Sequence, residues 1–132
     1  MIDTSVSLLV VDDFRTMSLI LCKLAREIGF RDVDQAHDGF TALDRLRQKR
    51  YGLVISDWNM QPMTGAQLVQ AMRADPALAG IPVILITAEG SRHDEAWLSG
   101  ADGFLNKPFT AVDLAAAIED VFSRVAEQRA SA

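Results

Sequence analysis

The sequence predicts an α/β protein that forms a single (βα)5 unit, a doubly wound parallel sheet of five strands with helices on both faces. Short apolar runs alternate along the chain with stretches in which apolar residues recur every three or four positions, which is the pattern of βα repeats. The runs are continuously apolar, as expected for strands that are buried on both faces. The 132 residues predict one domain, with an ordered core over residues 5–127.

The first strand is expected over 8–11 and the second over 33–36. Between them lies a helix whose buried stripe is formed by Met17, Ile20, Leu21, Leu24 and Ile28. Gly29 follows as a typical helix stop. A second helix is marked by Phe40, Leu43 and Leu46. It ends among basic side chains, whose positive charge suits a helix C-terminus. These side chains form either a docking patch or a solvated helix face. They are Arg45, Arg47, Lys49 and Arg50.

The third strand is expected over 53–56, directly before Asp57. Thr64 is a suitable N-cap for a third helix, which ends before Pro76 and carries the apolar residues Leu68, Val69 and Met72. A loop over 77–82 then leads into the fourth strand, over 83–86.

The last part of the chain contains a short helix over 94–99, a fifth strand at about 103–106 and a long final helix. Gly90 precedes the short helix, which is expected to be marginal because glycine disfavours helix. Thr110 and Asp113 form a capping-box pattern at the start of the final helix. Its buried stripe is formed by Leu114, Ile118, Val121, Phe122 and Val125. We expect the tail from Gln128 to fray.

Composition excludes several classes of function. The formal net charge of −5 argues against nucleic-acid binding, which needs clustered Lys and Arg. No apolar run approaches the roughly 20 residues of a membrane helix, and the N-terminus lacks the features of a signal peptide. The single cysteine, Cys22, fits a reducing compartment and a place in the core. We therefore expect a cytoplasmic protein. His37 and His93 have no ligand-type neighbours and are expected to be solvated.

Polar residues follow four of the predicted strands at the point where each strand ends. They are Asp12 and Asp13, then Asp57, then Thr87, and finally Lys107. Each alone is more often a cap or a surface residue, but all occur at equivalent places in the βα pattern. Because the carboxyl ends of parallel strands share one sheet edge, where open α/β folds bind ligands, these residues are expected to form one site.

The residue types at that edge suit a hard cation and a phosphoryl group. Clustered carboxylates repel one another unless a cation compensates, and Mg²⁺ prefers oxygen ligands. A remaining carboxylate can then act as nucleophile toward phosphorus. A lysine neutralises charge on the transferring group, and a hydroxyl can donate to it.

Four segments of the sequence carry a resemblance to a known family. The segments Asp12–Met17, Asp57–Met60, Thr87–Glu89 and Lys107–Phe109 resemble those of the receiver domains of two-component signalling. The chain is most similar to the stand-alone chemotaxis response regulators (CheY-like). This resemblance implies a flavodoxin-like sheet with strand order 2-1-3-4-5, which makes the four polar strand ends neighbours.

The resemblance also implies a role for each site residue. Asp57 would accept a phosphoryl group from a histidine kinase and would help to bind Mg²⁺. Asp13 would coordinate the metal directly, Asp12 through a bound water, and Asn59 through its main-chain carbonyl.

Further positions act on the phosphoryl group in the family. Lys107 would pair with the phosphoryl oxygens, with a cis peptide bond before Pro108, and Thr87 would move toward the phosphoryl group. Asn59 and Glu89 would set the lifetime of the phosphate. Phe104 stands in place of the switch aromatic, usually a tyrosine, and is equally an ordinary strand residue. Trp58 is expected near the pocket, whereas Trp97 is either a core anchor or a partner contact.

The leading hypothesis is a single-domain response regulator that signals by phosphorylation-dependent partner binding in chemotaxis. Its partners would be a sensor histidine kinase and a flagellar motor switch protein, a phosphatase or a histidine phosphotransfer protein, with no nucleic acid or membrane. It would catalyse only its own phosphorylation and dephosphorylation. The alternatives are a phosphorelay intermediate, a phosphate sink or, in another class, a small aspartyl-phosphate phosphatase. The last usually has a second acid two residues after its nucleophile, where this chain has Asn59.

Overall fold

The computed structural model describes residues 2–88 and 100–131. Five parallel strands form one sheet in the order β2-β1-β3-β4-β5, as the resemblance implies. The strands are β1 (Leu8–Val11), β2 (Val33–Ala36), β3 (Leu53–Asp57), β4 (Val83–Thr87) and β5 (Gly103–Asn106). Two of them are one residue longer than expected, because Asp57 and Thr87 still pair with the neighbouring strand.

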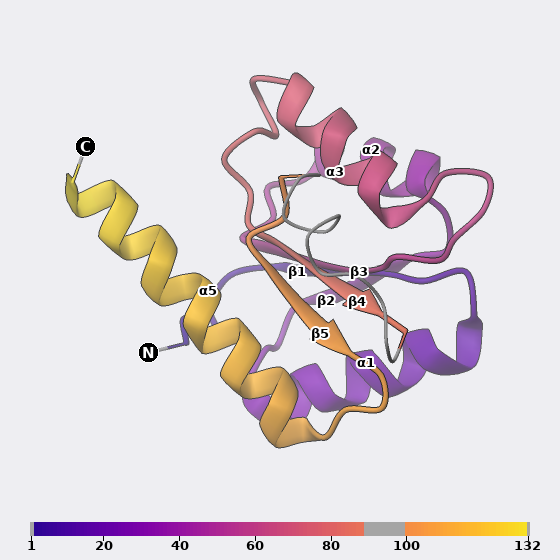
Figure 1. The fold of residues 1–132 in the computed structure, drawn as a ribbon, viewed down its shortest axis with the longest axis horizontal. Helices are drawn as coiled ribbons and strands as arrows, with labels where there is room; N and C mark the ends of the chain where they lie inside the picture. The colour runs from indigo at the N-terminus through magenta and orange to yellow at the C-terminus, as the bar shows by residue number, and fades with distance from the viewer. Residues whose placement is uncertain (1, 89–99, 132) are drawn as a thin grey trace.

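The described helices cover both faces of the sheet (Figure 1). They are α1 (Arg15–Ile28), α2 (Gly39–Gln48), α3 (Gly65–Ala74) and α5 (Ala111–Ser131). Helices α1 and α5 lie on one face, and α2 and α3 lie on the other. None of the helices in the described part of the chain has the length and apolar character needed to cross a bilayer.

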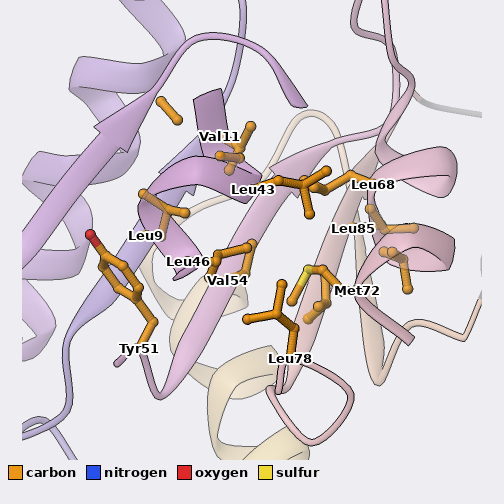
Figure 2. Packing of buried hydrophobic residues seen from close by; sticks show 14 of the residues in the cluster. Leu9, Val11, Leu43, Leu46, Tyr51, Val54, Leu68, Met72, Leu78 and Leu85 are labelled. Atoms are coloured by element: carbon orange, nitrogen blue, oxygen red, sulfur yellow. The ribbon is translucent and has the colours of Figure 1, made fainter. Parts of the chain in front are cut away.

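Alternate residues of the central strands enter two separate cores. Leu9, Val11 and Leu85 pack toward α2 and α3, and Figure 2 shows part of that cluster. Leu8 and Ile84 pack toward α1 and α5. Such complete burial on both faces explains why these strands are continuously apolar in sequence.

Several helix ends form as the sequence predicts. The N–H of Gly29, at φ +130°, bonds to the carbonyls of Ala25 and Arg26. Thr64 caps α3 in a reciprocal capping box with Gln67. Thr110 and Asp113 exchange equivalent bonds of 2.9 and 3.2 Å at the start of α5.

Other expectations were wrong or lie outside the described residues. Ile20 and Phe40 are 44% and 58% exposed, because the buried faces of α1 and α2 are centred on other residues. Helix α5 extends to Ser131, and the fraying expected from Gln128 onward stays a prediction. The short helix expected over 94–99, with Trp97, lies outside the described part, as does His93.

The basic residues near the end of α2 are partly engaged in ion pairs. Lys49 Nζ lies 2.8 Å from Asp32 Oδ2 and 2.9 Å from Asp34 Oδ2, and it also lies over the ring of Tyr51. Arg47 pairs more loosely with Asp75, at 3.6 Å. These contacts favour a structural role for Lys49 over a docking role.

Arg73 of α3 joins three segments that the sequence pattern does not connect. Its guanidinium donates to the carbonyls of Ala79, Ile81 and Gly100 at 2.8–3.0 Å. It also lies 2.7 Å from the Asp102 carboxylate, which accepts a bond from the N–H that begins β4. Arg73 thereby fixes the starts of β4 and β5, the two strands that end at Thr87 and Lys107.

Candidate phosphoryl and metal site

The predicted site residues meet at the carboxyl edge of the sheet. Asp12 and Asp13 follow β1, Asp57 ends β3, Thr87 ends β4 and Lys107 follows β5. Because these four strands are adjacent in the order of the sheet, residues far apart in sequence become neighbours. The sheet topology, rather than any single helix or loop, assembles the site.

Three carboxylates form its centre. One oxygen from each of Asp12, Asp13 and Asp57 lies within 4.8 Å of the other two. Asp12 is fully buried and Asp57 is 6% exposed, whereas Asp13 is exposed. Asp12 Oδ1 accepts a bond of 2.9 Å from the N–H of Phe14. Its buried Oδ2 has no hydrogen-bond partner among the described residues.

The electrostatics of this cluster favour protonation or a bound cation. Burial is the main cause that raises the pKa of the Asp12 carboxyl, and the nearby charge of Asp57 adds to the shift. Burial likewise raises the pKa of Asp57, although Lys107 opposes that shift. An ionised carboxylate without a partner is costly inside a protein. The acids are therefore poised to bind a cation.

Lys107 supplies positive charge on one side of the cluster. Its Nζ lies 3.2 Å from Asp57 Oδ1, and the peptide bond between Lys107 and Pro108 is cis. The main chain there is also tied to β4, because the N–H of Lys107 donates to the carbonyl of Thr87 at 2.8 Å. The Gln61–Pro62 bond is cis as well, which the sequence did not predict.

The backbone after Asp57 is held by β4 and by α3. The N–H of Trp58 donates to Ile86 at 2.8 Å, and the N–H of Gly65 donates to the carbonyl of Trp58 at 2.9 Å. A Cβ atom on Gly65 would lie only 2.4 Å from the carbonyl oxygen of Asp57. Gly65 therefore allows α3 to approach the strand end, a role that a lone glycine before a helix did not reveal.

His37 supports Asp12 from the end of β2. The expectation that it is solvated was wrong, because it is half-buried and its Nδ1 lies 3.2 Å from the main-chain oxygen of Asp12. A carbonyl oxygen only accepts, so Nδ1 carries the proton in this bond. The N–H of Asp12 donates to Ala36 at 3.1 Å. The position of Asp12 is thus fixed from the strand beside it.

The remaining predicted positions are less closely tied to the acids. Thr87 is 1% exposed, and its hydroxyl donates to Asn106 Oδ1 at 2.6 Å. Asn59 is exposed two residues after Asp57. Phe104 is half-buried and packs against the core on the α2–α3 face. Glu89 lies outside the described residues.

Comparison with known proteins agrees with the fold. The family model for the response regulator receiver domain matches residues 8–119, and the chain belongs to that family. Within it, the chain is 44% identical over 120 residues to the chemotaxis protein CheY of Pseudomonas aeruginosa, covering 89% of this chain and 97% of that protein.

Solved structures extend the same comparison. Chemotaxis protein CheY4 of Vibrio cholerae superimposes with a TM-score of 0.81 at 31% identity, over 89% of this chain and 98% of its own. The receiver domain of a histidine kinase from Syntrophus aciditrophicus gives a TM-score of 0.82 at 32% identity, over 92% of each chain. The protein is thus a CheY-like receiver domain.

Proposed function

We propose that this protein is a response regulator that accepts a phosphoryl group on Asp57 from a histidine kinase. The phosphorylated protein then binds a partner with an affinity different from that of the unphosphorylated protein. One observation carries the proposal. The nearly buried carboxylate of Asp57 lies between two other acids and the ammonium of Lys107, which is 3.2 Å away. That set of groups contains a nucleophile, oxygen ligands for a cation and a positive charge for a phosphoryl group.

The transfer follows from these positions. A carboxylate oxygen of Asp57 attacks phosphorus while the bond from phosphorus to the donor's imidazole nitrogen breaks. The electron pair of that bond stays on the nitrogen, and an acyl phosphate forms on Asp57. Lys107 is close enough to Asp57 to pair with a phosphoryl oxygen once one carboxylate oxygen carries the phosphoryl group. The ammonium of Lys107 therefore has a negatively charged partner before and after the transfer.

The donor set fits Mg²⁺. Asp12, Asp13 and Asp57 would hold the ion, with the main-chain carbonyl of Asn59 as a further ligand. The buried Oδ2 of Asp12 has no hydrogen-bond partner among the described residues and is therefore a suitable ligand atom, because hard oxygen ligands are those that Mg²⁺ prefers. When bound, the ion neutralises negative charge on the acids and on the phosphoryl group.

The output we propose is control of chemotaxis through a flagellar motor switch protein. The support is the similarity to proteins named for chemotaxis over nearly their whole length. We expect the chain to catalyse only its own phosphorylation and dephosphorylation. The second candidate is a phosphorelay role. Its support is the similarity to the receiver domain of a histidine kinase, at a sequence identity close to that of CheY4.

Phosphorylation with acetyl phosphate tests the assignment of Asp57. With Mg²⁺, intact mass should show one added phosphate on the wild type and none on Asp57→Asn. Lys107→Ala should fold normally but should be phosphorylated much more slowly. The matched control is Asp44→Asn on the exposed surface of α2, which should label like the wild type. Labelling that persists in Asp57→Asn would refute the assignment.

A binding experiment tests the output. The protein treated with beryllofluoride, which mimics the phosphoryl group, should bind an isolated flagellar motor switch protein more tightly than the untreated protein does. Equal binding in both states would contradict the chemotaxis role. Preferential binding to a histidine phosphotransfer protein would favour the phosphorelay role instead.

A further inference from the structure

The hydroxyl of Thr87 already has a partner on β5. Thr87 and Asn106 are paired residues of β4 and β5, so their side chains project from the same face of the sheet. The Thr87 hydroxyl donates to Asn106 Oδ1 at 2.6 Å. The carbonyl of Thr87 accepts a second bond, of 2.8 Å, from the N–H of Lys107. Both the side chain and the main chain of Thr87 are thus held toward β5.

A threonine hydroxyl has a single proton and can donate it to one acceptor at a time. The family resemblance implies that Thr87 moves toward a phosphoryl group on Asp57, which ends the strand on the other side of β4, and its hydroxyl would then donate to a phosphoryl oxygen. The bond to Asn106 and the bond to the phosphoryl group therefore exclude each other. Since the Thr87 main chain is fixed by Lys107, rotation of its side chain is the simplest way to exchange them.

We propose that Asn106 is a positioning residue that holds Thr87 in the unphosphorylated arrangement, so that the protein responds only when a phosphoryl group competes for the Thr87 hydroxyl. This proposal rests on the proposed phosphorylation of Asp57 and on the movement of Thr87 that the family resemblance implies. In this role Asn106 acts through the hydroxyl of Thr87, whose proton it accepts. It acts by setting the equilibrium between the two positions of the Thr87 side chain.

The size of the effect follows from the strength of one hydrogen bond. A typical net contribution corresponds to a factor of roughly two to ten in an equilibrium constant. A ligand that binds only one of two arrangements gains apparent affinity when the competing arrangement is weakened. Loss of the Asn106 acceptor should therefore tighten the binding of a phosphoryl mimic by about two- to tenfold.

The test is a titration with beryllofluoride in saturating Mg²⁺, followed by the emission of Trp58. Asn106→Val and Asn106→Ala both remove the acceptor, and because Asn106 is exposed both should fold. Each should bind the mimic about two- to tenfold more tightly than the wild type. In a Thr87→Ala background, the same substitutions should leave the affinity unchanged, because the hydroxyl that they release is gone.

Two results would overturn the proposal. One is wild-type or weaker affinity in both Asn106 variants, as expected if Asn106 only stabilises the fold. The other is a gain in affinity that persists in the Thr87→Ala background. Failure of the proposed function looks different, because the wild type itself would then not bind beryllofluoride, and this inference would fall with it.

Discussion

Replacement of Asp12 by asparagine should stabilise the metal-free protein, although Asp12 is fully buried in the site. The asparagine keeps an oxygen for the N–H of Phe14, which now bonds to Oδ1 at 2.9 Å. It also places an amide N–H₂ where the partnerless Oδ2 lies. That amide can donate to a neighbouring carboxylate. The change therefore removes a buried negative charge and retains the existing hydrogen bond.

The magnitude follows from the spacing of the acids. The carboxylate oxygens lie within 4.8 Å of one another, and at that upper limit two unit charges repel by about 3.5 kcal/mol at an effective dielectric constant near 20, and by about 0.9 kcal/mol in bulk water. Lys107 offsets part of this repulsion through its 3.2 Å contact with Asp57, and Asp13 is exposed to solvent. We therefore expect Asp12→Asn to raise the free energy of unfolding by about 1–3 kcal/mol without metal.

Mg²⁺ should reverse the order of the two proteins. The wild type should gain about 4.1 kcal/mol when the ion is present at about 1,000 times its dissociation constant. Asp12→Asn, which lacks one of the three acids, should gain far less. Urea unfolding of both proteins, with chelator and with Mg²⁺, measures all four values. The control Asp44→Asn, which makes the same change of charge on the exposed surface of α2, should stay within about 0.5 kcal/mol of wild type.

The reasoning would be refuted if Asp12→Asn were less stable than the wild type in chelator. It would also be refuted if Mg²⁺ stabilised both proteins equally. The first result would mean that the charge of Asp12 is well compensated inside the fold. The second would mean that the ion binds elsewhere.

Acidity provides an independent check on the sign. The pKa of Asp12 is raised in the folded protein, chiefly by burial, so its folded state binds a proton more tightly than the unfolded chain does. Ionisation of Asp12 therefore does not lower the free energy of unfolding below the unfolded pKa of 3.8. The loss of stability grows as the pH rises through the raised pKa of the folded protein. The stability advantage of Asp12→Asn in chelator should be full above the raised pKa of Asp12 and should shrink as the pH falls toward 3.8.

Two further predictions concern stability. Gly65→Ala should lower the free energy of unfolding by about 1–3 kcal/mol, because its Cβ would lie 2.4 Å from the main-chain oxygen that ends β3. Gly80→Ala, where a Cβ would meet nothing within 4 Å, should be neutral or slightly stabilising in the same urea titration. Arg73→Met should cost about 1–3 kcal/mol by leaving partly buried partners unpaired. The exposed, looser ion pair of Arg47 should cost less than about 1 kcal/mol on mutation to Met, and a comparable loss in both would contradict the role of Arg73.

The sequence was sufficient for the parts of this molecule that depend on local pattern. Leu8–Val11 and Leu53–Asp57 are recognisable as buried strands because strands covered on both faces are continuously apolar. The grouping of Asp12, Asp57 and Lys107 could also be predicted. It needs only the rule that parallel strands share a carboxyl edge, together with the strand order that the family resemblance supplies.

Contacts that depend on exact register could not be predicted in the same way. The bond between Thr87 and Asn106 needs these two residues to be direct partners of β4 and β5, which apolar runs alone do not reveal. His37 and Gly65 act through main-chain atoms of Asp12 and of the end of β3, and such contacts leave no pattern in side-chain types. Arg73 contacts carbonyls, which every residue carries.

These contacts together indicate which interaction should oppose the change from the unphosphorylated to the phosphorylated arrangement. In the proposed function, binding of a cation would give Asp12 Oδ2 the partner that it lacks among the described residues, and it would relieve the repulsion among the acids. In the proposed function, Lys107 would exchange its carboxylate partner on Asp57 for a phosphoryl oxygen and so keep an ion pair. Among these interactions, the bond from Thr87 to Asn106 is the one with which a phosphoryl group would have to compete. The sensitivity of the response should therefore be adjustable at position 106 alone, with the acids that bind and transfer the phosphoryl group left unchanged.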